Sequence, residues 1–182
     1  MKASHLIKLA TVRLDTYPVK IKHVFSTQIF KHGAEWMYIY MQGKAPHATF
    51  DPSTPYHTYG LYKYGISITA CLASLFALIQ IHILLAPLSI LVFYCFEIQF
   101  LFLFPLLLDK VSKPIVKSIL YTYKVGPFKA LFIVLQIGTF MVLGLLNFRN
   151  PLRKWYIGCI SVLIWYELEV RPHLFEAPPK HS

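Results

Sequence analysis

Long apolar stretches separated by short basic segments dominate this 182-residue chain from about residue 65 onward. Between Gly65 and Leu108 the sequence has no Lys, Arg or Asp, and Glu97 is its only acid. A membrane-spanning helix needs about 20 predominantly apolar residues, so this block predicts two spans, 65–85 and 87–108. The Ala-Pro-Leu-Ser sequence at 86–89 is the expected turn, because proline disfavours helix in the residue before it and begins helices well.

Two more apolar stretches follow a basic loop at 109–129. The first is uncharged and predicts a third span at 130–148. The second, 152–170, predicts a fourth span. The aromatic residues near its two ends are closer together along a helix than the thickness of the hydrocarbon core, so an interfacial helix is the alternative. The apolar middle of the basic loop can lie along the membrane surface as a short helix. The sequence therefore predicts an all-α integral membrane protein: a small bundle of about four transmembrane helices within residues 63–170.

The N-terminal third is expected to be an extramembrane, peripheral segment, residues 1–62. It contains three short hydrophobic pieces: a possible interfacial helix at Leu6–Leu14, an alternating, extended piece at Pro18–Phe25, and an aromatic run at Trp36–Met41. Glycine and prolines make 43–55 a loop. The segment has too few apolar residues for a core of its own, so we expect it to lie against the membrane, the spans or a partner. Residues 171–182 form a polar tail.

Composition supports a membrane protein. Hydrophobic residues make up 56% of the chain and charged residues 14%, whereas soluble domains have about 25% charged residues. The net charge of +10 comes with no nucleic-acid recognition motif, and the basic residues flank the apolar blocks. The expected partner is therefore the lipid bilayer and not nucleic acid.

The distribution of basic residues predicts the orientation of the spans. With four crossings, all Lys and Arg residues except Arg149, Arg153 and Lys154 fall on the side that holds both termini. The positive-inside rule places that side in the cytoplasm, or in the matrix for an organellar inner membrane.

Glu97 is the most informative single residue, because an ionised carboxylate near the bilayer centre is costly unless it is protonated, paired or hydrated. It could handle protons or cations, or it could hydrogen-bond to another helix, with Gln136 or Thr139 as expected partners. His82 lies near the end of the first span, too far along the helix from Glu97 for a metal pair. An interfacial histidine is the simpler interpretation.

A stripe of small residues on one face of the first span predicts close helix packing, within the protein or with a partner. Its members are Ser67, Ala70, Cys71, Ser74 and Ala77.

Other polar groups suggest no recognised site. His47, Asp51 and His57 share one proline-rich loop, but their spacing matches no known metal site, and loop histidines in water are the default. Glu167 and Glu169 are expected to be solvated and to face different directions. The common catalytic signatures are absent from the sequence, and no cofactor can be assigned.

Three functions remain open at this level. The first is a non-catalytic subunit or assembly factor of a larger membrane complex, with other membrane proteins as partners. The second is a small proton-coupled or solute transporter that uses Glu97, with His82 as a further polar group. The third is a lipid-modifying membrane enzyme built on the His47, Asp51 and His57 loop.

Overall fold

The computed structural model describes residues 1–16, 28–42, 50–147 and 149–175, and every regular element in these ranges is helical, as predicted. The predicted extended piece at 18–25 lies outside them. The α-helices are α1 (Ala3–Thr16), α2 (Ile29–Gln42), α3 (Tyr56–Ile81), α4 (Leu88–Glu97), α5 (Leu103–Leu108), α6 (Pro114–Val125), α7 (Pro127–Leu145), α8 (Pro151–Trp165) and α9 (Pro172–Phe175). The other helices in the described ranges are two short 3-10 helices, η1 (Ile83–Leu85) and η2 (Ile98–Phe100), and a π-helix, η3 (Tyr166–Val170).

Within the described ranges, three helical segments are long and apolar enough to cross a membrane: Tyr56–Ile81, Ile83–Leu108 and Pro127–Leu145. They fall on the first three predicted spans. The predicted fourth span, 152–170, covers α8 and η3 and is not among them. It carries four charged residues, Arg153, Lys154, Glu167 and Glu169. A crossing by this segment stays a prediction.

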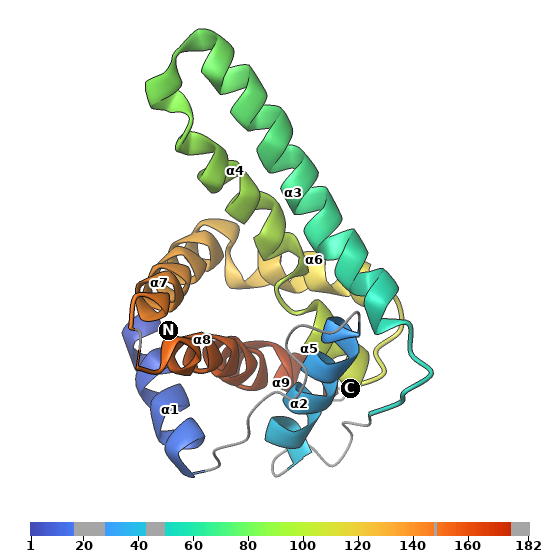
Figure 1. Cartoon of the computed structure of the whole chain (residues 1–182). Coiled ribbons are helices and arrows are strands. Elements are labelled where there is room, and N and C mark those ends of the chain that lie inside the picture. Colours follow the sequence, from blue (N-terminus) through green and yellow to red (C-terminus); the bar gives the residue numbers. More distant parts are fainter. Residues whose placement is uncertain (17–27, 43–49, 148, 176–182) are drawn as a thin grey trace, which may run out of the picture.

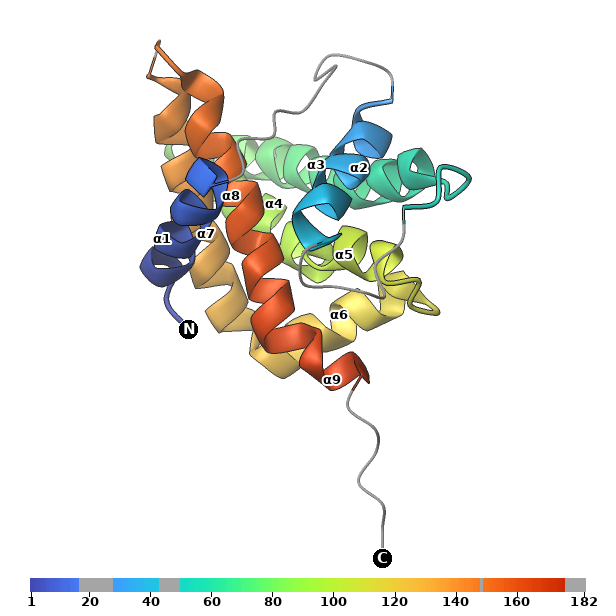
Figure 2. The same cartoon turned by 90° about the horizontal axis from the view of Figure 1, so that it is seen from below.

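The first two apolar segments form a hairpin, and α3 and α4 project side by side from the remaining helices (Figure 1). We call α1, α2 and α5–α9 the helical body. In this body α7 and α8 pack along each other and run across the direction of the hairpin, as the two views together show (Figure 2). This arrangement is more open than the predicted four-helix bundle, which the structure does not confirm.

Two prolines determine where the apolar block bends. A proline lacks an N–H and its ring clashes with the carbonyl four residues earlier, so Pro87 disturbs the helix at Ile83 and Pro105 disturbs it at Leu101. Accordingly α3 ends at Ile81 and η1 follows, and the second apolar segment breaks between η2 and α5. The predicted second span, 87–108, is thus confirmed as one apolar segment, with an internal break before α5 that the prediction did not include.

The body packs around α8 and α5. All six residues of α5 are buried, and more than half of α8 is buried as well. Helix α1 packs along α8 through Leu6, Ala10 and Leu14, and α2 packs on α3, α5 and α8 with Trp36 and Met41 buried. The described parts of the N-terminal segment thus cover the other helices instead of forming a core.

Close approach between α7 and α8 depends on glycine. A Cβ atom at Gly144 would collide with Cβ of Lys154, which is fixed to the α8 backbone and cannot rotate away. Gly65 on α3, in contrast, has open space where a Cβ would lie. The two helical glycines therefore differ in whether a methyl group can be added.

This contrast gives a matched test. We expect Gly144→Ala to destabilise the protein by about 1–3 kcal/mol, because α7 and α8 must move apart. Gly65→Ala should stabilise it by about 0.5–1 kcal/mol through the helix propensity of alanine. Unfolding in mixed detergent micelles, followed by circular dichroism, measures both. Equal stabilisation by the two variants would contradict the close α7–α8 contact.

Candidate functional site

A buried ion pair joins the two helices of the hairpin at its base. The ammonium nitrogen of Lys63 on α3 lies 2.9 Å from Oε1 of Glu97, the last residue of α4. Only 8% of the Lys63 side chain and 13% of the Glu97 side chain are exposed. Charges removed from water this completely require each other, so the pair fixes the position of α3 against α4 where the hairpin meets the body.

The surroundings of this pair are aromatic. Lys63 Nζ lies 5.2 Å from the centre of the Tyr64 ring, and Tyr64 stacks on Phe30 of α2. The same Phe30 ring stacks on Phe104 of α5 and fills the space beside Gly60, where a Cβ would collide with it. Aromatic packing from three helices thus shields the base of the hairpin from water.

One oxygen of the pair is not accounted for by hydrogen bonds. Oε2 of Glu97 is buried and has no hydrogen-bond partner among the described residues. A buried polar atom of this kind is rare and needs an explanation, such as a protonation or ligand-binding role. The Tyr56 hydroxyl, at the start of α3, is the other buried side-chain polar atom without a partner in the described ranges.

Lys63, rather than Gln136 or Thr139, pairs with Glu97, so the expected partner was wrong. Gln136 and Thr139 are exposed on α7. Lys63 was not expected as a partner, because the first predicted span started at residue 65. Helix α3 begins at Tyr56, which places Lys63 about two turns inside it.

His82 caps the tip of the hairpin. It is exposed, and its Nδ1 accepts a hydrogen bond from the backbone N–H of Leu84 at 3.2 Å. Glu97 ends α4 at the other end of the hairpin. The two candidate polar groups therefore lie at opposite ends of one structural unit.

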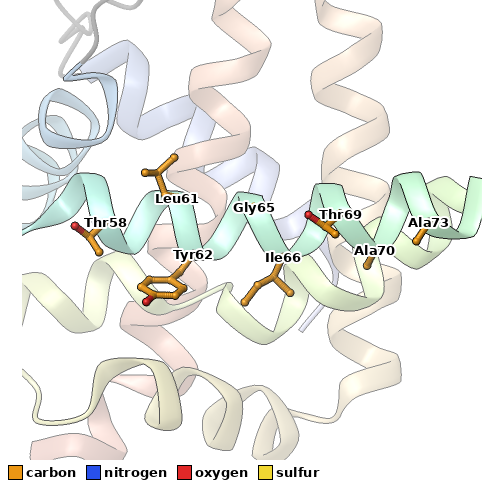
Figure 3. Close-up of a pocket in the computed structure, with 8 residues that line it drawn as sticks. All are labelled: Thr58, Leu61, Tyr62, Gly65, Ile66, Thr69, Ala70 and Ala73. Atoms are coloured by element: carbon orange, nitrogen blue, oxygen red, sulfur yellow. The ribbon is translucent and has the colours of Figure 1, made fainter.

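The predicted small-residue stripe lies partly between the hairpin helices. Ser67 is fully buried, Ala70, Cys71 and Ser74 are half-buried, and Ala77 is exposed. Beside the stripe, a shallow groove follows the outer flank of α3 (Figure 3). The groove is lined by Thr58, Leu61, Tyr62, Gly65, Ile66, Thr69, Ala70 and Ala73.

The loop residues suggested for an enzyme site are engaged locally. Asp51 accepts hydrogen bonds from the hydroxyl and the amide of Ser53, and these bonds lower the pKa of the Asp51 carboxyl. His57 lies against the Phe30 ring, and His47 is outside the described residues. Within the described ranges, no three His, Cys, Asp or Glu side chains are close enough to hold a metal ion.

A second buried ion pair was missed by the sequence analysis. Asp109, whose side chain is completely buried, accepts two hydrogen bonds from Arg171 at 3.0 Å and one from the Tyr166 hydroxyl at 2.6 Å. It ties the end of α5 to the end of η3. The signal was present, because Asp109 directly follows the uninterrupted apolar run that becomes buried α5.

Glu167 and Glu169 are also paired, so the expectation that they are solvated was wrong. Glu167 binds both terminal nitrogens of Arg13, at 2.8 and 3.1 Å. Glu169 accepts hydrogen bonds from Lys129 and from the Trp165 indole. These contacts fasten α1 and the start of α7 to η3, and short-range spacing along the chain could not reveal partners so far away in sequence.

The chain matches no protein-family model, no curated protein and no solved structure.

The role of the Lys63–Glu97 pair can be tested by double substitution. Glu97→Gln leaves the Lys63 ammonium buried without a counter-charge, and we expect it to cost about 3–5 kcal/mol. Replacing both residues by apolar ones of similar size, as in K63M/E97L, should recover most of that loss. Unfolding in mixed micelles gives the free energy of unfolding of wild type, E97Q and the double variant. A double variant as unstable as E97Q would show that the loss does not come from the unpaired Lys63 ammonium.

Proposed function

We propose that this protein is a non-catalytic integral membrane subunit, or an assembly factor, of a larger membrane protein complex. The observation that carries the proposal is the exposure of the projecting α3–α4 hairpin. Large apolar side chains at least 41% exposed occur along both of its helices: Ile66, Ile68, Leu72, Phe76, Ile79, Leu88, Ile90 and Leu91.

Such a surface needs an apolar environment. Monomeric soluble proteins rarely expose contiguous apolar patches above a few hundred Å², and only 6% of the most apolar stretch of α3 is buried. With 26 residues, α3 is about 39 Å long at 1.5 Å per residue, enough for a hydrocarbon core of about 30 Å. Lipid is the environment that fits both its length and its composition.

A partner helix fits the groove on α3. Without a hydrophobic driving force in lipid, helices associate where small residues let the backbones approach closely. Gly65, Thr69 and Ala73 provide that kind of surface on the flank of α3 that α4 leaves open. We propose that a transmembrane helix of another subunit packs there.

The ionisable groups support a structural role. Lys63 and Glu97 pair with each other, and Asp109 pairs with Arg171. Ionisable groups that pair in this way hold helices together, and few such groups remain for transport or catalysis. A non-catalytic subunit needs only ion pairs that hold its helices together, whereas a transport path usually contains several ionisable groups.

A transporter remains the second candidate because of one observation, the buried and unpartnered Oε2 of Glu97. A carboxyl oxygen in this position could take up and release a proton. If purified protein moves a solute into vesicles and Glu97→Gln abolishes that movement in a folded protein, the transporter function replaces the subunit function.

The subunit proposal predicts migration far above 21.1 kDa on a native gel in mild detergent, together with other proteins. Adding bulk to the groove with T69L/A73L should release those proteins while the chain still inserts, because the backbones can no longer approach. The matched control, I68F/L72F, adds bulk to exposed positions of α3 outside the groove. Wild type that purifies alone as a monomer would refute the proposal.

We propose further that Ser4, Lys117 and His173 share the cytoplasmic or matrix side, from the excess of basic residues there. Single cysteines at these positions, with Cys71, Cys95 and Cys159 replaced by alanine, should resist an impermeant thiol reagent in intact cells or mitoplasts. A cysteine at Asn150 should react. Labelling of His173 together with Asn150 would mean that α8 does not cross the membrane.

A further inference from the structure

Helix α6 connects two of the candidate spans, and its inner face is fixed to the body. The Ser118 hydroxyl donates a hydrogen bond to the Gln99 carbonyl, and the Thr122 hydroxyl donates one to the Ile98 carbonyl, both at 2.9 Å. Ser118, Tyr121 and Thr122 are buried. These contacts determine which side of α6 faces outward.

The outward side carries two adjacent stripes of different character. Val116, Leu120 and Tyr123, which are 48–61% exposed, form an apolar stripe at spacings of four and three. Lys113, Lys117 and Lys124 form a basic stripe at spacings of four and seven. At 100° per residue the helical members of each stripe stay close to one line along α6, and the two stripes lie side by side. Lys113 is the residue just before the helix.

No acidic side chain in the described ranges neutralises this basic stripe. Asp109, the nearest acid in sequence, is buried and bonded to Arg171, and Glu169 is bonded to Lys129. Lys124 lies over the Tyr121 ring, at 5.1 Å from its centre, and is exposed. The outward face of α6 therefore presents net positive charge next to exposed apolar side chains.

We propose that this outward face of α6 binds anionic phospholipid at the membrane surface. The lysine ammonium groups would contact the lipid phosphates, and Val116, Leu120 and Tyr123 would enter the boundary between headgroups and acyl chains. The inference rests on the proposed membrane location of the protein.

The position of α6 in the chain favours lipid over other anionic partners. Five residues separate it from α5, and Gly126 alone separates it from α7. The positive φ of 100° at Gly126 makes this connection tight. Helix α6 also lies across the base of the projecting hairpin (Figure 1), the level at which a hairpin that enters a bilayer meets its surface.

The test uses a fluorophore on the apolar stripe. L120C, in a background with the three native cysteines replaced by alanine, is labelled with an environment-sensitive dye and reconstituted in phosphatidylcholine vesicles. Trace acyl-chain spin-labelled phosphatidylglycerol or phosphatidylcholine is then added as a quencher. Each lysine near an anionic lipid is worth about fivefold in association at low salt. We therefore expect phosphatidylglycerol to quench at least fivefold more strongly than phosphatidylcholine.

This preference should fall towards one in K113Q/K117Q/K124Q and at 0.5 M salt, because screening removes it. K2Q/K8Q/R149Q removes the same charge from exposed positions elsewhere and should keep the preference. Equal quenching by the two lipids in wild type, or equal loss in both triple variants, would overturn the inference. Flotation with vesicles after carbonate treatment is scored separately, so a failure of membrane insertion is distinguished from a failure of lipid preference.

Discussion

Two side-chain hydrogen bonds from α6 to the backbone beside the break in the second apolar segment hold the centre of the molecule together. Pro105 interrupts the second apolar segment. Beside the break, the Ser118 hydroxyl of α6 donates to the Gln99 carbonyl and the Thr122 hydroxyl donates to the Ile98 carbonyl. An unsatisfied carbonyl in apolar surroundings costs several kcal/mol. These two hydrogen bonds fix α6 beside the break, which separates the exposed hairpin from buried α5.

The same region distributes the chain between two environments. Above the break, α3 and α4 present apolar side chains outward and hold their charged groups, Lys63 and Glu97, against each other. Below it, α5 and α8 are buried within the body. A second pair, Asp109 and Arg171, joins the end of α5 to the end of η3. The Lys63–Glu97 pair thus joins the two helices at the base of the hairpin, and the Asp109–Arg171 pair joins helices of the body.

The sequence predicted features that depend on local order along the chain. Helical class, the first three apolar segments and the turn at Pro87 follow from apolar length and from the proline itself, and they agree with the structure. The partners of charged residues did not follow, because Lys63 and Glu97, or Arg13 and Glu167, meet only through tertiary packing. The start of α3 at Tyr56 was missed since its first turns are polar and aromatic. The break before α5 was predictable from Pro105, because a proline acts four residues before itself.

The central claim, that the projecting hairpin lies in lipid, is tested most directly by the environment of its middle. Leu72, midway between Lys63 and the end of α3 at Ile81, is 58% exposed and can be replaced by a single labelled cysteine in the reconstituted protein. The account predicts strong quenching of this label by a spin label deep in the acyl chains, with protection from aqueous iodide. Ready quenching by iodide without quenching from the acyl chains would place the hairpin in water and contradict the account.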